Sequence, residues 1–216
     1  MIRPSSAVDM ENSTLGKFDG FTERGKLTIE EICKKAAIVF SEKGYTSATL
    51  TDVSHAAGIS KAGIYHYFAA KEELLFFVIN RYMDLVMGRL EEDLEATPPT
   101  ERVHLFVRRH IDLHKNNVHE SQVILHEIKN LPPKYWAIVR TQMKEYHRLL
   151  VSAIEGLNGW DDVPPESKKI AAYSLLGMCN WIYWWYDPEG RVSPEALSDI
   201  IVKIFEGKLR KEDDKR

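Results

Sequence analysis

The stretch that decides the fold is Thr49-Leu-Thr-Asp-Val-Ser-His-Ala-Ala-Gly-Ile-Ser-Lys-Ala-Gly-Ile-Tyr-His-Tyr-Phe68. It contains two short helical patterns separated by a tight turn at Gly58-Ile59-Ser60. Thr49 and Ser60 are of the types that accept hydrogen bonds at a helix N-terminus, and Gly58 can adopt the left-handed backbone that a tight turn needs. This spacing is typical of a helix-turn-helix and predicts that the second helix runs from Ser60 to Phe68.

The two faces of this second helix differ in chemistry. Small and apolar side chains can form the core that fixes the angle between the helices, and these are Val53, Ala57, Ile59, Ile64 and Phe68. The opposite face presents Lys61, Ala62, Tyr65 and His66. The small residues Ala62 and Gly63 would let the helix N-terminus lie deep in a major groove, where its free N–H groups and positive dipole end suit phosphate.

The flanking sequence extends the helical pattern in both directions. Apolar residues from Ile29 to Phe40 recur at three- and four-residue steps and predict a helix from Lys26 that ends at Gly44. Thr28 and Glu31 have the spacing of a capping box, as do Thr49 and Asp52. Residues 1–25 show no apolar period and are expected to form a flexible arm. Lys71 is expected to begin a long helix that reaches about Ala96.

Residues 24–71 carry seven Lys and Arg against four Asp and Glu, although the whole chain has a net charge of −3. A basic segment on an acidic body suits a polyanionic partner at one end only. Pairs of prolines at 98–99, 132–133 and 164–165 separate further helical patterns. No stretch alternates as a strand does, and no internal repeat is present. We therefore predict an all-α protein of about nine helices.

Residues from Lys26 to about Leu75 resemble the N-terminal domain of TetR-type transcriptional regulators. The family motif is similar to Ala-Gly-Val-Ser-x-Gly-x-x-Tyr-x-x-Phe followed by Lys-x-x-Leu. The residues that match it here are Ala57, Gly58, Ile59, Ser60, Tyr65, Phe68, Lys71 and Leu74. The chain departs from the motif at Ala62, where the family commonly has Gly, and at Gly63, where Ser or Thr is frequent.

This resemblance implies a DNA-binding domain over residues 26–72. Thr49, Thr51 and Lys71 would contact phosphate. The residues that would face the DNA groove or its phosphate backbone are Ser60, Lys61, Ala62, Gly63, Tyr65 and His66. The implied function is a transcriptional repressor that binds a palindromic double-stranded DNA operator as a homodimer and is released by a small-molecule effector.

Residues 73–216 would form the ligand-binding and dimerisation domain, which dimerises in this family through its last two long helices. Those helices are expected at about 166–186 and 194–209. Apolar, aromatic and small residues recur on them at helical spacing. The candidates for the dimer interface are Tyr173, Gly177, Trp184, Trp185, Leu197, Ile201, Ile204 and Phe205.

The effector is expected to be a small apolar molecule. The aromatic-rich segment from Asn180 to Arg191 resembles the corresponding helix end of acyl-CoA-responsive members of the family, which favours an acyl-CoA thioester; another apolar or aromatic molecule is the alternative. No cofactor is expected. The candidate pocket residues are Phe77, Met83, Met87, Phe106, His110, Met143, Tyr146, His147, Met178 and Trp181.

Two rival classes of function remain. His110 and His114 are four residues apart on a predicted helix, a spacing that can bind a metal ion in a metalloprotein or an enzyme. No third ligand lies at a diagnostic distance, and Asn130 stands where a zinc-protease motif starting at His126-Glu127 needs its second histidine. We therefore expect no catalytic residue, no metal site and no enzyme activity. The other rival is a helical interaction module with no role at DNA.

The compartment is inferred from what the sequence contains. The two cysteines, Cys33 and Cys179, lie far apart in apolar helical patterns and predict neither a disulfide framework nor a CxxC site. The N-terminal residues have no apolar core of a secretory signal. No apolar run is long enough to span a membrane. These observations predict a cytoplasmic protein without a membrane partner.

Overall fold

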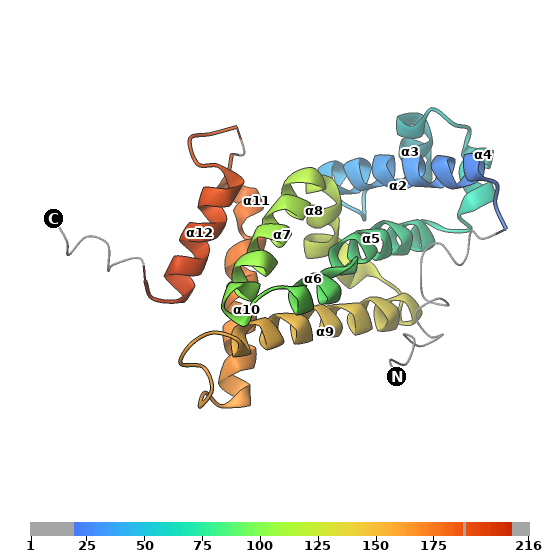
Figure 1. Ribbon diagram of the computed structural model, residues 1–216. Helices are drawn as coiled ribbons and strands as arrows, with labels where there is room; N and C mark the ends of the chain where they lie inside the picture. Colours follow the sequence, from blue (N-terminus) through green and yellow to red (C-terminus); the bar gives the residue numbers. More distant parts are fainter. Residues whose placement is uncertain (1–19, 188, 209–216) are drawn as a thin grey trace. The chain divides into compact units, whose positions relative to one another are not determined.

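The computed structural model describes residues 20–187 and 189–208, and these residues form helices joined by loops, without a strand (Figure 1). The all-α prediction is therefore confirmed. The described residues divide into two compact units: one contains 20–85 together with 119–142, and the other contains 86–118 together with 143–187 and 189–208. None of the helices in the described ranges is both long and apolar enough to cross a membrane.

The first unit holds the predicted helix-turn-helix. Its elements are α2 (Glu23–Lys43), α3 (Leu50–Ala57), α4 (Lys61–Tyr67), most of α5 (Lys71–Met87), α8 (Val118–Glu127), the 3-10 turn η3 (Ile128–Asn130) and the first half of α9 (Pro133–Glu155). In Figure 1, α3 and α4 follow the blue helix α2, and α3 packs against both of its neighbours.

The local signals of the helix-turn-helix are confirmed. The Thr49 hydroxyl accepts a hydrogen bond from the Asp52 N–H at 3.1 Å, and the Thr49 N–H donates to the Asp52 carboxylate at 2.8 Å, which together form the predicted capping box. Gly58 ends α3 with φ 66°, in the left-handed region. Ser60 caps α4 by accepting from the Gly63 N–H at 3.0 Å.

The start of α2 differs from the prediction. The helix begins at Glu23 rather than at Lys26, and its cap is Thr22, whose hydroxyl accepts from the Gly25 N–H. The predicted capping box at Thr28 is wrong, because the Thr28 hydroxyl donates to the Arg24 carbonyl inside the helix. Residues 1–19 of the predicted arm lie outside the described residues.

The core of the first unit is built from apolar faces of several helices. Phe40 of α2, Ile64 of α4, and Phe68 and Leu74 around the start of α5 are fully buried. The segment 119–142 belongs to this unit through specific contacts: the rings of Phe76 and Tyr135 stack at 4.3 Å. Ser41 also hydrogen-bonds His119 at 2.8 Å. The compact unit thus extends beyond residue 72, where the sequence suggests a domain boundary.

The predicted single helix from Lys71 to Ala96 is interrupted. The helix α5 ends at Met87, Arg89 adopts a left-handed conformation with φ 54°, and α6 (Leu90–Ala96) follows. Gly88 has little helix propensity. The Arg109 guanidinium donates to the Gly88 carbonyl and forms an ion pair with Asp93 at 2.7 Å. This long-range partner stabilises the break by satisfying a carbonyl at the end of α5.

The second unit contains α6, the 3-10 turn η2 (Pro99–Glu101), α7 (Arg102–Asn116), the second half of α9, α10 (Pro165–Asn180), α11 (Ile182–Trp185) and α12 (Pro194–Phe205). Phe106, Leu150, Ile154 and Leu175 lie in its buried core, and α12 packs along α7. The predicted helix over 166–186 is divided at Trp181 into α10 and α11. Leu209 lies outside the described residues.

A pair of glycine substitutions tests the turn. Gly58→Ala should lower the free energy of unfolding by about 1 kcal/mol, because a Cβ is unfavourable at φ 66° even though no atom lies within 4 Å of it. Gly63→Ala, inside α4, is the matched control and should raise the stability by up to about 1 kcal/mol. Urea unfolding followed by circular dichroism measures both. Equal effects of the two substitutions would contradict the assigned turn.

Candidate DNA-binding and effector sites

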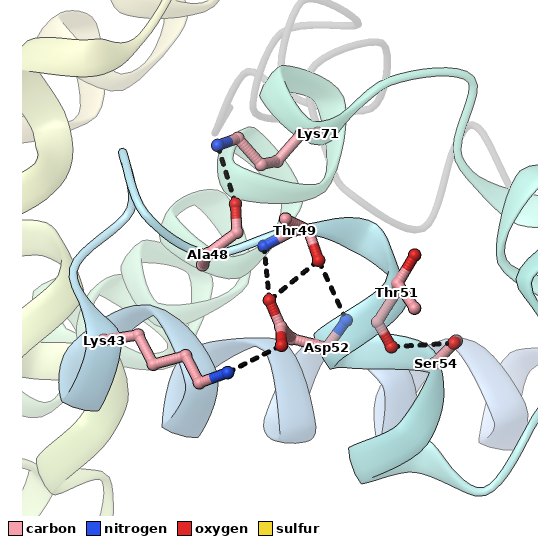
Figure 2. A network of polar contacts seen from close by, with 7 residues as sticks. All are labelled: Lys43, Ala48, Thr49, Thr51, Asp52, Ser54 and Lys71. Carbon is pink, nitrogen blue, oxygen red and sulfur yellow. Dashed lines mark hydrogen bonds and ion pairs between the residues drawn. The ribbon is translucent and has the colours of Figure 1, made fainter.

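A network of polar contacts fixes the N-terminus of α3 (Figure 2). The Lys43 ammonium contacts the Asp52 carboxylate at 2.6 Å, and the other carboxylate oxygen accepts from the Thr49 N–H and hydroxyl. The hydrogen bond from Lys43 and those from Thr49 hold the pKa of Asp52 well below its usual range. Asp52 is therefore ionised at neutral pH, and it serves the cap of α3 rather than an external ligand.

Lys71 is placed differently from the prediction. Its ammonium donates to the carbonyl oxygens of Tyr45 and Ala48, each at 2.9 Å, and lies 4.3 Å from the centre of the Tyr45 ring. Figure 2 shows this side chain directed at the Ala48 carbonyl. Lys71 thus fixes the loop between α2 and α3 in this conformation, and its contact with phosphate stays a prediction.

An open depression of about 460 Å³ brings several predicted DNA-binding residues together. Its lining includes Thr49, Thr51, Lys61, Tyr65 and Lys71. The exposed Lys61 supplies a positive charge, and the first turn of α3 supplies backbone N–H groups at the positive end of its dipole. Charge and donors of this kind suit a backbone phosphate, which positions a protein on DNA without reading sequence.

The remaining predicted residues of α4 differ in exposure and in their contacts with neighbouring side chains. Ser60, Ala62 and His66 are exposed, whereas Gly63 is half-buried. The His66 ring packs edge-on against Tyr67 at 4.8 Å and against Phe21 at 5.9 Å. Sequence reasoning missed Phe21, because it stands before the first apolar period and contacts α4 only in three dimensions.

The second unit brings three of the predicted pocket residues together. The His110 Nδ1 lies 2.8 Å from the Tyr146 hydroxyl, and the Phe106 and Tyr146 rings are 4.7 Å apart. His147 stacks on Tyr173 at 3.7 Å. Of the others in this unit, Met87 and Met178 are half-buried, whereas Met143 and Trp181 are exposed.

Phe77 and Met83 belong to the first unit. Both are buried in the first unit, where the Phe77 ring contacts Phe68 at 5.6 Å. They follow the helical apolar period of α5, and that period alone cannot distinguish core positions from ligand contacts. In this fold Phe77 contributes to the core that supports the helix-turn-helix.

Two buried histidines lie one turn apart on α7. Burial lowers the pKa of His110 to about 4, with a smaller contribution from the neighbouring His114, while a hydrogen bond to Asn180 acts in the opposite direction. Burial likewise lowers the pKa of His114 to about 4. Both imidazoles are therefore neutral at pH 7. Within residues 20–187 and 189–208, no three His, Cys, Asp or Glu side chains gather as a metal site would require.

The predicted dimer residues separate into exposed and buried groups. Tyr173, Gly177, Trp184, Trp185 and Ile204 are exposed. Leu197 and Ile201 are only 4% and 5% exposed because they pack inside their own chain, and Phe205 is half-buried against Trp160. Leu197 and Ile201 thus belong to the core of their own chain, and their side chains leave almost no surface for a partner.

Further apolar side chains on α10 to α12 are exposed although they were not predicted as contacts. Ile170 is 65% exposed, and Ile200 is 38% exposed. Trp181, predicted as a pocket residue, is 58% exposed. Together with Trp184 and Ile204, these residues add to the large apolar side chains that this part of the chain exposes when it is alone.

Comparison with known families accounts for most of the chain. Residues 32–77 match the bacterial regulatory proteins of the tetR family, and residues 96–209 match the tetracyclin repressor-like C-terminal domain. The second match alone covers more than half of the 216 residues. The chain belongs to the TetR family.

Three proteins illustrate the similarity of this TetR-family chain to known members. The transcriptional repressor KstR2 of Mycolicibacterium smegmatis is 25% identical, over 82% of this chain and 88% of its own length. The fatty acid metabolism regulator protein of Bacillus subtilis is 30% identical, over 81% of this chain and 92% of its own length. The crystal structure of AibR with isovaleryl coenzyme A and operator DNA is 30% identical with a TM-score of 0.72, and the match covers 82% of this chain and 97% of that chain.

Two lysine substitutions distinguish a direct DNA contact by Lys61 from a positioning role of Lys71. Lys61→Met should weaken binding to all DNA sequences, reduce the salt slope of the affinity by about one, and leave stability unchanged within about 0.5 kcal/mol. Lys71→Met keeps the aliphatic stem but removes the donors to three loop carbonyls, so it should lower the free energy of unfolding by about 1–3 kcal/mol. Fluorescence anisotropy against salt and urea unfolding measure these effects. A normal stability of Lys71→Met would refute its positioning role.

Proposed function

We propose that this TetR-family protein is a cytoplasmic transcriptional repressor that binds a palindromic operator as a homodimer and is released by a small apolar effector, for which an acyl-CoA thioester is the best candidate. The observation that carries the DNA-binding part is the exposed face of the helix-turn-helix. On this face Thr49, Thr51, Lys61 and Tyr65 line one open depression at the start of α3. We propose no cofactor and no catalytic activity for the chain.

In the proposed complex, α4 enters the major groove and the depression receives a backbone phosphate. Lys61 and the half-exposed Tyr65 contribute side-chain contacts, and the first turn of α3 contributes N–H groups. The network of Lys43, Asp52 and Thr49 keeps that turn in place before DNA binds. A prearranged site of this kind loses little conformational entropy on binding.

The proposed homodimer is supported by the exposed apolar side chains of α10 to α12. Trp184 is 72% exposed, Tyr173 is 64% exposed and Ile204 is 47% exposed in the single chain. Aromatic residues are enriched at interface cores. A two-fold dimer also matches the symmetry of a palindromic operator, whose half-sites lie about one helical turn apart.

The proposed effector class is supported by two proteins of 30% identity. One is named a fatty acid metabolism regulator, and the other was solved with isovaleryl coenzyme A and operator DNA. In our proposal the effector binds in the second unit and disfavours the spacing that fits two half-sites. The effector can shift the equilibrium only by binding the released state more tightly than the state that fits the operator. A ~100-fold difference between these two affinities would correspond to ~2.7 kcal/mol.

The regulatory function is tested with the full-length protein and DNA from upstream of its own gene. We expect a mobility shift that persists with excess unrelated DNA, and a release of the DNA when isovaleryl-CoA or a longer acyl-CoA is added. Free coenzyme A is the control and should not release the DNA. No sequence-specific shift at low salt would refute the repressor, whereas a shift insensitive to every acyl-CoA would refute only the effector class.

The dimer is tested by placing a charge on the proposed interface. Ile204→Arg should convert the dimer to a monomer and weaken operator binding at least tenfold, because a buried unpaired charge is costly. Leu27→Arg is the matched control, since Leu27 is 66% exposed on α2 in the other unit. Analytical ultracentrifugation gives the mass, and circular dichroism checks the helical content. A stable dimer of Ile204→Arg would place the interface elsewhere.

A further inference from the structure

The interior of the second unit contains a polar group without a protein partner. His114 lies on α7, is only 5% exposed, and its Nε2 atom makes no hydrogen bond with the described residues. A buried polar atom without a partner is unfavourable, and native proteins seldom leave one without a water, an ion or a ligand to meet it. His110, one turn earlier, is by contrast satisfied by Tyr146 and Asn180.

His114 has an aromatic neighbour, and its pKa shift has no contribution from a charged side chain. The Tyr183 ring of α11 lies 5.9 Å from the His114 ring. Burial alone depresses the pKa of His114, and no charged side chain contributes to the shift. The neighbouring His110 is also neutral at pH 7, because its pKa is lowered to about 4. An uncharged hydrogen-bonding group therefore fits beside His114 without a change in the charge of either histidine, whereas a buried anion would first require a histidine to be protonated.

We propose that the Nε2–H of His114 donates a hydrogen bond to the thioester carbonyl oxygen of the effector. The Nε2–H of His114 suits an uncharged acceptor, so the ligand group beside it is a carbonyl rather than a carboxylate. The carbonyl oxygen satisfies a donor that the protein leaves unmatched, while the acyl chain contacts the apolar side chains of the same unit. This inference rests on the proposed acyl-CoA response. It assigns His114 as the residue that distinguishes an acyl-CoA from a CoA compound without the carbonyl oxygen.

The assignment predicts which part of the ligand His114 recognises. An acyl-CoA and the S-alkyl-CoA of the same chain length differ at the acyl carbon, where the thioether lacks the carbonyl oxygen. The wild-type protein should bind isovaleryl-CoA about tenfold more tightly than S-(3-methylbutyl)-CoA, which is the effect of about one hydrogen bond. Octanoyl-CoA and S-octyl-CoA form a second pair, so that the result does not depend on one chain length.

Three variants complete the test by isothermal titration calorimetry on the full-length protein. His114→Phe should bind thioester and thioether with equal affinity, because the donor is absent. His114→Gln keeps an N–H donor and should retain part of the preference. His104→Gln, at a partly exposed position on the same helix, is the matched control and should behave as the wild type. The comparison forms a double-mutant cycle between a ligand atom and a side chain.

The outcomes separate this inference from the repressor function. A wild-type preference for the thioester that disappears in His114→Phe and persists in the control supports the assignment. An unchanged preference in His114→Phe overturns it, and so does a wild type that binds no CoA compound. Operator binding is measured on each preparation by mobility shift. If the operator is bound normally in either of the negative cases, the DNA-binding function stands and the assignment of His114 fails alone.

Discussion

The helix-turn-helix depends on the fixation of the short loop that precedes α3. Within this loop, the Lys71 ammonium satisfies the carbonyl oxygens of Tyr45 and Ala48, each at 2.9 Å. From the other side, the Glu127 carboxylate accepts from the Tyr45 N–H at 3.2 Å. With the loop held at both ends, Thr49 stands where it can cap α3, and the depression at the start of that helix has a defined shape. Lys71, whose place in the sequence motif implies a contact with DNA, thus stabilises a loop of its own chain.

The parts of the fold that the sequence predicts well are those with local causes. The cap at Thr49, the left-handed Gly58 and the cap at Ser60 each depend on residues within three or four positions, so a single stretch contains the whole signal. The start of α2 shows the limit of such reasoning. Thr22 and Thr28 are both acceptable caps by type, and the chain uses the earlier one, because the helix continues through Thr28 without a break.

The parts that the sequence predicts poorly depend on distant partners. Gly88 indicates a weak point in a helix, but the break is also stabilised by Arg109, more than twenty residues away, which donates a hydrogen bond to the Gly88 carbonyl. Likewise, an apolar stripe on α12 cannot reveal which of its residues face the same chain. Leu197 and Ile201 pack into the core, whereas Ile204 remains exposed. Lys71 belongs to the same class, since its acceptors precede it by more than twenty residues.

The recognition helix offers few side chains for reading bases. Ala62 and Gly63 have no polar side-chain atoms, the Ser60 hydroxyl oxygen is engaged in the cap, and the His66 ring packs against Tyr67 and Phe21. Lys61 and Tyr65 are the long, exposed side chains that remain on its outer face. In the proposed complex, a helix with so few polar side chains would approach the base edges closely but would make few direct hydrogen bonds to them. The selectivity of the proposed dimer would then depend more on the spacing of two half-sites and on the sequence-dependent shape of the DNA, which contribute specificity at positions that no side chain touches.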